Sequence, residues 1–159
     1  MAGEIFLKEG AIFTLESSGS SLTNNTAVAA SNNYDVRSGG SAGIVQNIEA
    51  IFEFLCQWST VTGIVAGTAA AELHVIPSID GTNFSDVDTT SGSSFISYPA
   101  YVGSFVCCKT PTASTNMRFH SAPIRLRSFL YKPYILNRSG QTIASTWTLK
   151  VMSLRFQYT

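Results

Sequence analysis

Two histidines are the residues of this sequence best suited to acid–base chemistry. His74 and His120 could each act as a general base, a role that requires hydrogen-bond reach to the proton being removed. Neither histidine lies beside a Ser or Cys in a sequence context typical of a nucleophile. We therefore expect both to be structural or surface residues, and we predict that the chain is not an enzyme.

A group of carboxylates follows at Asp80, Asp86 and Asp88, with Asn83 among them. Oxygen-rich loops can bind calcium, but this spacing does not follow the EF-hand pattern. Asp and Asn are also favoured in tight turns, because they tolerate turn geometry. We favour the turn interpretation and predict neither a metal site nor a cofactor, since Walker and Rossmann glycine patterns are missing from the sequence as well.

The three cysteines, Cys56, Cys107 and Cys108, are odd in number, and two of them are adjacent. This spacing suits neither a disulfide framework nor a zinc site. We expect the cysteines to be small buried residues in strands, in a protein made in a reducing compartment.

The composition favours an all-β fold. The chain has 159 residues, of which 45% are hydrophobic and 13% are charged. Soluble helices usually carry many Glu, Lys and Arg residues on their outer faces, so the low charge disfavours an all-α fold. No apolar run approaches the roughly 20 residues that span a bilayer, and the N-terminus lacks a secretion signal. We predict one domain-sized chain with no membrane partner.

From residue 44 onward, apolar and polar residues alternate in short segments separated by turn residues. This pattern predicts an antiparallel β-sandwich or jelly roll over residues 44–159. In the last strand the apolar parity changes near Val151–Leu154, which predicts a bulge or a change of sheet. The predicted strands cover residues 49–59, 69–78, 95–108 with a break at Pro99, 117–119, 124–131 and 146–158.

Residues 1–43 have a different character. A short strand is predicted within residues 4–16, and residues 17–43 are rich in Ser, Gly and Asn. So little apolar area cannot by itself offset the entropy of ordering this stretch. We expect an extended N-terminal arm that lies on a neighbouring molecule.

The zero formal net charge hides an asymmetry along the chain. All ten acidic residues lie at or before Asp88, and eight of the ten basic residues lie after position 100. Opposite charges could pair across the sheets of one fold, which we favour, or acidic and basic surfaces of neighbouring copies could meet. Because the basic residues are spread through strands and offset by carboxylates, we predict no direct nucleic-acid binding.

The candidate interface residues come from the arm and from the basic second part of the chain. They are Tyr34, Asp35, Arg37, Arg125, Arg127 and Arg138. A different possibility is a sugar-binding platform of exposed aromatic rings. Buried side chains at Trp58, Tyr98, Tyr101 and Trp147 would argue against that platform.

Three stretches carry a family resemblance: residues 69–84 (AAAELHVIPSIDGTNF), 101–105 (YVGSF) and 137–142 (NRSGQT). Together they resemble small β-sandwich structural proteins of tailed bacteriophages, of the capsid cement or decoration type. The resemblance covers residues 44–158 and rests on turn and core residues. It implies a virion subunit, assembled in the host bacterial cytoplasm, that binds the major capsid protein lattice and other copies of itself. A tail, neck or baseplate subunit and a carbohydrate-binding module for host attachment are the alternatives.

Overall fold

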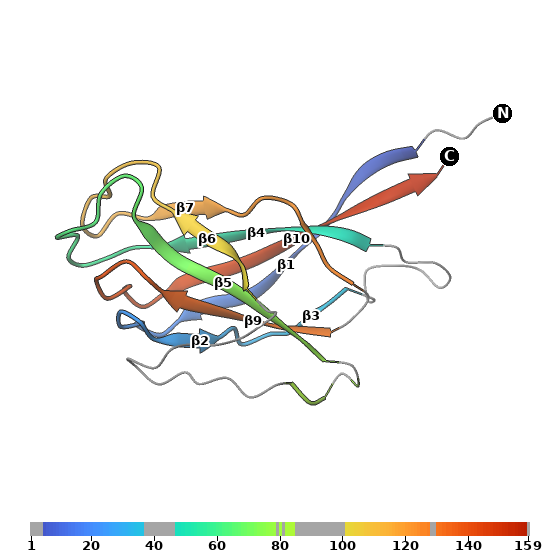
Figure 1. The fold of residues 1–159 in the computed structure, drawn as a ribbon, viewed down its shortest axis with the longest axis horizontal. Helices are drawn as coiled ribbons and strands as arrows, with labels where there is room; N and C mark the ends of the chain where they lie inside the picture. Colours follow the sequence, from blue (N-terminus) through green and yellow to red (C-terminus); the bar gives the residue numbers. More distant parts are fainter. Residues whose placement is uncertain are drawn as a thin grey trace.

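The computed structural model describes residues 5–36, 47–78, 80, 82–84, 101–127 and 130–158, with the side chains of all but 5–8, 47–48 and 155–158. Every regular element in this part of the chain is a β-strand. The strands form two antiparallel sheets that lie one on the other (Figure 1). The predicted all-β antiparallel sandwich is therefore confirmed.

The first sheet has the strand order β1-β10-β4-β7, and a short strand, β8, also pairs with β4. Its strands are β1 (Ile5–Gly19), β10 (Trp147–Tyr158), β4 (Asn47–Cys56), β7 (Met117–His120) and β8 (Ile124–Arg125). The second sheet has the order β2-β9-β5-β6, and β3 also pairs with β9. Its strands are β2 (Ala27–Ala29), β9 (Leu130–Asn137), β5 (Ala69–Ser78), β6 (Tyr101–Val106) and β3 (Tyr34–Asp35).

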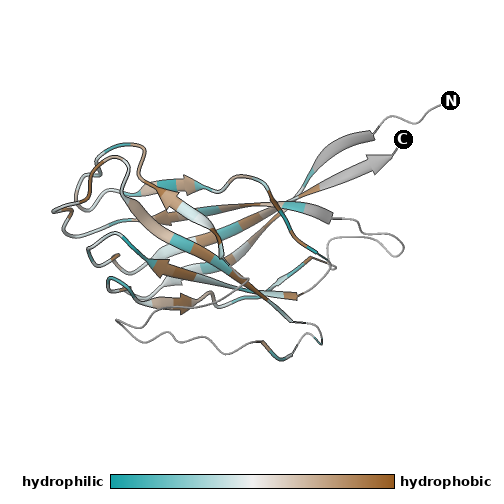
Figure 2. Cartoon of the chain, viewed as in Figure 1, coloured by the Kyte–Doolittle hydropathy of each residue, from teal (hydrophilic) through white to brown (hydrophobic). Residues whose placement is uncertain are grey.

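The main core lies between the sheets, and in β4 it is built from every second residue. β5 and β9 of the second sheet have consecutive buried residues, and Ala27, Ile76, Tyr134 and Leu136 form a second, smaller cluster. In β4, Ala50, Phe52, Phe54 and Cys56 are buried, whereas residues 51, 53 and 55 are only half-buried. Brown bands interrupted by teal ones run along the strands in Figure 2, and the alternating burial along β4 has the period of two of a β-strand. The alternation used to predict a strand over residues 49–59 thus identified the inward face of β4 correctly.

Aromatic rings join the two layers. The ring of Phe54 lies 5.4 Å from that of Phe105, which belongs to β6 of the second sheet. On its own sheet, Phe54 lies 6.2 Å from Phe119 and 5.9 Å from Trp147, measured between ring centroids. Such ring pairs add to the stabilisation from apolar burial, so this cluster is a centre of the core.

Residues 20–36 belong to the sandwich, which corrects the expectation of an extended arm. β2 and β3 pair with β9, and Leu22 forms a bridge to Ile143. Leu22, Tyr34 and Val36 are buried in the main core. The few large apolar residues of this stretch are buried, and its backbone groups form hydrogen bonds with β9. Residues 37–46, which contain the expected domain boundary at 43/44, lie outside the described residues.

Two other strand predictions need correction. The short strand expected within residues 4–16 runs from Ile5 to Gly19. Residues 124–131, predicted as one strand, serve both sheets, because β8 pairs with β4 whereas β9, which begins at Leu130, pairs with β5. A period-two pattern continues through such a change of sheet and does not reveal it. Of the predicted strand at 95–108, β6 accounts for residues 101–106, and Pro99 lies outside the described residues.

The parity change in the last strand coincides with bulges in the neighbouring strands. β10 stays in one sheet, and its register with β4 is regular from Thr148 to Leu154. The extra residues lie on β1, between Glu9 and Ile12, and on β4, opposite the step from Leu154 to Arg155. Beyond these bulges, the start of β1 and the end of β10 continue as a two-stranded ribbon that projects from the sandwich (Figure 1).

Candidate interaction surface

The outward face of the first sheet carries a row of apolar residues. Ile12 of β1 is the register partner of Met152 of β10, and Met152 is the register partner of Ile51 of β4. Register partners lie on the same side of a sheet, so the three side chains form one line across three strands. The Ile12 side chain is 66% exposed, and Ile51 and Met152 are partly exposed. We call these three residues the apolar row.

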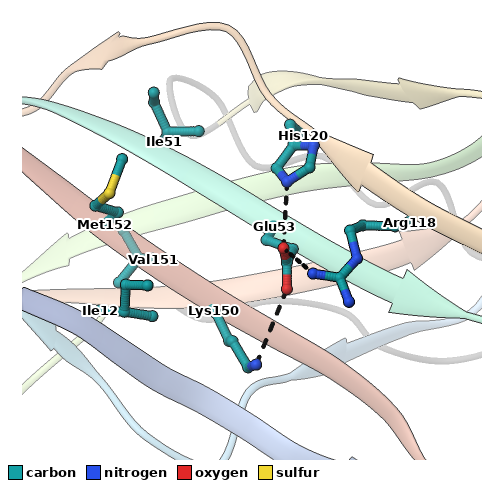
Figure 3. Close-up of a pocket in the computed structure, with 8 residues that line it drawn as sticks. All are labelled: Ile12, Ile51, Glu53, Arg118, His120, Lys150, Val151 and Met152. Atoms are coloured by element: carbon teal, nitrogen blue, oxygen red, sulfur yellow. Dashed lines mark hydrogen bonds and ion pairs between the residues drawn. The ribbon is translucent and has the colours of Figure 1, made fainter.

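Beside the apolar row, three basic side chains surround the carboxylate of Glu53 (Figure 3). Arg118 Nη1 donates a hydrogen bond to Glu53 Oε2 over 2.8 Å, and His120 Nε2 lies 3.2 Å from the same oxygen. Lys150 Nζ lies 4.0 Å from Glu53 Oε1. We call these four residues the Glu53 cluster. They come from β4, β7 and β10, so the cluster exists only when the sheet is formed.

The Glu53 cluster and the apolar row together line a shallow hollow of about 250 Å³. Its lining residues offer a carboxylate, an imidazole and two cations but no hydroxyl or thiol group. The Glu53 carboxylate is paired with its three basic neighbours. The side chains of Arg118, His120 and Lys150 are 58%, 56% and 41% exposed. A mixed apolar and charged surface of this kind is suited to contact with another molecule.

The opposed charges of the two parts of the chain meet inside the fold. Glu53 of β4 pairs with Arg118 of β7. Glu72 of β5 accepts a hydrogen bond from Arg138 Nε over 3.1 Å. Glu49 is the register partner of Arg125 on β8. The prediction that early carboxylates and late cations pair across the sheets is confirmed at these positions.

The structure does not bring the predicted interface residues together. Tyr34 is buried, with its ring against Phe13 and Phe52, so it is removed from any surface set. Asp35 is half-buried on β3, and Arg37 lies outside the described residues. The three arginines Arg125, Arg127 and Arg138 are exposed. Arg125 lies on β8 of the first sheet, whereas Arg138 follows β9 of the second sheet.

Asn137, in the NRSGQT stretch, is the centre of a buried hydrogen-bond network. Its Nδ2 group donates to the carbonyl oxygens of Leu22 and Gln141, at 2.8 and 2.7 Å. Its Oδ1 atom accepts bonds from the backbone and side chain of Ser139, and Ser139 Oγ also accepts a bond from Trp58 Nε1. This stretch therefore attaches the N-terminal segment to the sandwich. Its role is structural.

Glu16 was not singled out in the sequence, yet it fixes the same N-terminal segment. The carboxylate is buried and accepts hydrogen bonds from the backbone of Ser17 and Ser18 and from both the backbone and the side chain of Ser31. Burial alone would raise the pKa of Glu16, but these hydrogen bonds outweigh burial and hold the pKa below its ordinary value. A carboxylate followed by two serines gives no pattern that predicts this role.

Asp80 acts as a turn residue. Its Oδ1 atom accepts bonds from the backbone N–H groups of Thr82 and Asn83 and from the Ser78 hydroxyl, at 2.8–2.9 Å. The hydrogen bonds from the Asn83 and Thr82 backbone lower the pKa of Asp80 far below its ordinary value. The turn interpretation is confirmed for Asp80, whereas Asp86 and Asp88 lie outside the described residues. Within the described ranges, no three His, Cys, Asp or Glu side chains are grouped to hold a metal ion.

His74 is buried on β5, with Nε2 3.4 Å from a Glu72 carboxylate oxygen and its ring 5.4 Å from that of Tyr101. Burial lowers the pKa of His74, although the hydrogen bond and the charge of Glu72 act in the opposite direction. The histidine is therefore packed into the fold, as expected for a structural residue, whereas His120 lies in the Glu53 cluster on the surface.

Cys56 and Cys107 are buried and free, and burial raises the pKa of both thiols. The prediction of a small buried residue in a strand is confirmed for Cys56, the last residue of β4. Cys107 is buried as predicted but directly follows β6. Cys108 is free and exposed, which corrects the prediction for the third.

Two of the four aromatic residues considered for the alternative of a sugar-binding platform are buried. Trp58 and Trp147 are 0% and 2% exposed, which counts against that platform. Tyr101 is 56% exposed, and Tyr98 lies outside the described residues. The described strands and loops also include no helix that is long and apolar enough to cross a bilayer.

No protein-family model and no curated protein sequence matches this chain. Solved structures with a distant likeness include a decameric BFDV capsid protein, at 10% identity and a TM-score of 0.37, covering 98% of this chain and 99% of that one. A 60-mer BFDV capsid protein gives 10% identity and a TM-score of 0.34, covering 99% and 95%.

The structure of infectious bursal disease virus Gx strain gives 12% identity and a TM-score of 0.38. That match covers 96% of this chain but 32% of the other, so this chain spans about a third of its length. At such low scores, the likeness adds nothing to the strand arrangement described above.

Proposed function

We propose that this chain is a virion structural subunit of the cement or decoration type, which stabilises a phage head by binding between major capsid protein subunits. The resemblance of residues 69–84, 101–105 and 137–142 to such proteins supports the proposal. The protein would be made in the host bacterial cytoplasm and would end up in the virion. No cofactor and no chemical step enter this function.

The observation that carries the proposal is the outward face of the first sheet. A free-standing sandwich usually places polar residues on its outer faces. Here the apolar row lies in the open beside exposed cations, and Ile12 is 66% exposed. Apolar residues at the centre of a patch with charged residues around it are the usual composition of a protein–protein contact.

The charge distribution supports a protein partner over a nucleic acid. The carboxylates of Glu53 and Glu72 pair with Arg118 and Arg138 within the chain. Binding to a nucleic-acid backbone relies on cations that are free to neutralise several phosphates. We therefore propose a shell of protein subunits as the surface on which this chain acts.

The first test locates the chain in the particle. Purified virions are separated into heads and tails, and the number of copies of this chain in each fraction is measured by quantitative mass spectrometry. The proposal expects many copies on heads. Recovery with tails would establish a tail, neck or baseplate subunit in its place, and absence from both fractions would refute a virion role.

The second test asks which surface binds. Residues 5–36 contribute strands to both sheets, so deletion of the N-terminal region would remove part of the fold, and substitutions in the full chain are used instead. Ile12→Lys is expected to reduce occupancy on heads that lack this protein at least tenfold. Val65→Lys, at a loop position that is 55% exposed, is the matched control and is expected to bind normally. Equal occupancy by both variants would show that binding to heads does not depend on the outward face of the first sheet.

A further inference from the structure

The apolar row separates two sides of opposite charge on the outward face of the first sheet. On one side lies the Glu53 cluster, in which Arg118 and Lys150 outnumber the single carboxylate. On the other side, Leu154 of β10 is buried, and its register partners are the exposed Glu9 on β1 and the half-buried Glu49 on β4. Glu49 in turn faces Arg125 on β8. Among the described side chains, the first side therefore has a surplus of positive charge and the second a surplus of negative charge.

We propose that this face docks a second copy of this chain through a two-fold axis that runs parallel to the apolar row. When the second copy is turned over about this axis, its apolar row lies on the first apolar row. The Glu53 cluster of each copy then faces the Glu9 and Glu49 side of the other, and the same contact is made twice. Such a self-complementary face is what a two-fold contact between identical subunits requires.

The direction of the axis follows from the charges. A two-fold axis along the strands would also bring the two faces together, but it would place each Glu53 cluster against its own copy. The surplus cations Arg118 and Lys150 would then face each other, which is unfavourable. Only the axis parallel to the apolar row brings both apolar and opposite charged groups into contact.

The size of the face determines how strong the contact can be. With strands about 4.8 Å apart and residues about 3.3 Å apart along a strand, four strands over residues 148–154 present roughly 400–500 Å² of flat sheet per copy. Two such faces bury about 900 Å² in total, which lies in the range of weak and transient interfaces. The dimer is therefore expected only at high protein concentration or on an assembled particle, where many copies are held close together.

The experiment measures self-association of the full chain by sedimentation velocity from about 10 µM to about 1 mM protein, at about 50 mM and about 500 mM salt. We expect a reversible dimer at the upper concentrations that weakens as salt is raised. Ile12→Lys is expected to weaken dimerisation at least tenfold, and Val65→Lys is expected to leave it unchanged. A wild-type chain that stays monomeric up to the highest concentration would overturn the proposal.

A charge exchange tests the axis itself. Lys150→Glu and Glu49→Lys each place like charges opposite each other in their own dimers, so each variant alone should associate less than the wild type. A mixture of the two variants restores opposite charges at both contacts and should associate more strongly than either variant alone. A mixture no stronger than its components would overturn the two-fold geometry, and circular dichroism with thermal melting confirms that each variant is folded.

The inference rests on the proposed function for its purpose, which is assembly on a particle. There the outward face of the first sheet contacts a second copy, and the capsid subunits contact other surfaces of the pair. The two can fail separately. A chain that occupies heads but never dimerises keeps the proposed function and loses this contact. A chain that dimerises in solution but is absent from virions keeps the contact and loses the function.

Discussion

The N-terminal segment at residues 20–36 and the outward face of the first sheet contrast in how they use polar and apolar residues. The segment is rich in Ser and Asn, yet the buried groups of Glu16 and Asn137 fix it to the sandwich. The outward face is formed by long strands rich in apolar residues. On it Ile12 is exposed to solvent, and exposed cations surround Glu53. Whether a polar contact is buried therefore says more about its contribution to stability than whether the surrounding segment is polar or apolar.

The two regions should therefore respond differently to the loss of a polar contact. Removing one partner of a buried hydrogen bond leaves the other group with neither a protein partner nor water to bond. This costs about 1–3 kcal/mol for each group left unsatisfied. Removing an exposed ion pair returns both groups to water, and such pairs contribute about 0–1 kcal/mol. Three substitutions test this contrast, from the largest expected effect to the smallest.

Asn137→Ala should have the largest effect. It removes the bonds from Asn137 Nδ2 to the carbonyl oxygens of Leu22 and Gln141, each of which keeps one other donor, and the bonds that Asn137 Oδ1 accepts from Ser139. The buried N–H group of Ser139 then loses its acceptor. We expect a loss of about 3 kcal/mol or more in the free energy of unfolding, measured by urea denaturation. Asn24→Ala removes one exposed hydrogen bond to Gly140 and is the matched control, with an expected loss below about 1 kcal/mol. Equal losses for the two variants would contradict the contrast.

Glu16→Gln should have an intermediate effect that depends on pH. The hydrogen bonds hold the pKa of the folded Glu16 below the ordinary 4.5, so the ionised carboxylate stabilises the fold above that pH. This contribution is lost as the pH falls below about 4.5 and through the lower pKa of the folded state. At pH 7 we expect Glu16→Gln to lose about 1–3 kcal/mol, measured by urea denaturation.

The same measurement at pH 3 should show a smaller difference between the wild type and Glu16→Gln. At that pH the carboxylate of the unfolded wild-type chain is protonated, so part of the stability gained from the lowered pKa is already lost. Glu9→Gln, at an exposed position of β1, is the control and should change little at either pH. A difference for Glu16→Gln that stays constant from pH 7 to pH 3 would show that the ionised carboxylate is not the cause.

Arg118→Ala should have the smallest effect. Arg118 is 58% exposed, so loss of its hydrogen bond to Glu53 is expected to cost less than about 1 kcal/mol, and even less at high salt. Thermal melting at low and high salt measures the change, with Arg127→Ala at another exposed position as the control. A loss as large as that of Asn137→Ala would mean that the Glu53 cluster belongs to the stabilising framework and not to a free surface.

Much of the fold could be predicted from the alternation of apolar residues. The inward face of β4, from Ala50 to Cys56, was identified in this way, and so was the pairing of early carboxylates with late cations. The position of residues 20–36 could not be predicted, because its few apolar residues are sufficient only when another strand supplies hydrogen-bond partners. The apolar row could not be predicted either, since it depends on the register of three strands that are far apart in the sequence.

The sequence by itself determined the class of the molecule: an antiparallel sandwich of short alternating strands with turn residues such as Asp80 between them. Local side-chain chemistry and a period of two are sufficient for that, because they act within a few residues of the chain. Only the tertiary structure decided that Tyr34 lies in the core, that residues 124–131 change sheets, and that Ile12, Met152 and Ile51 lie in one row. These outcomes depend on which strands pair and in which register, and that is set by packing between residues far apart in the sequence, such as Ile12 and Met152.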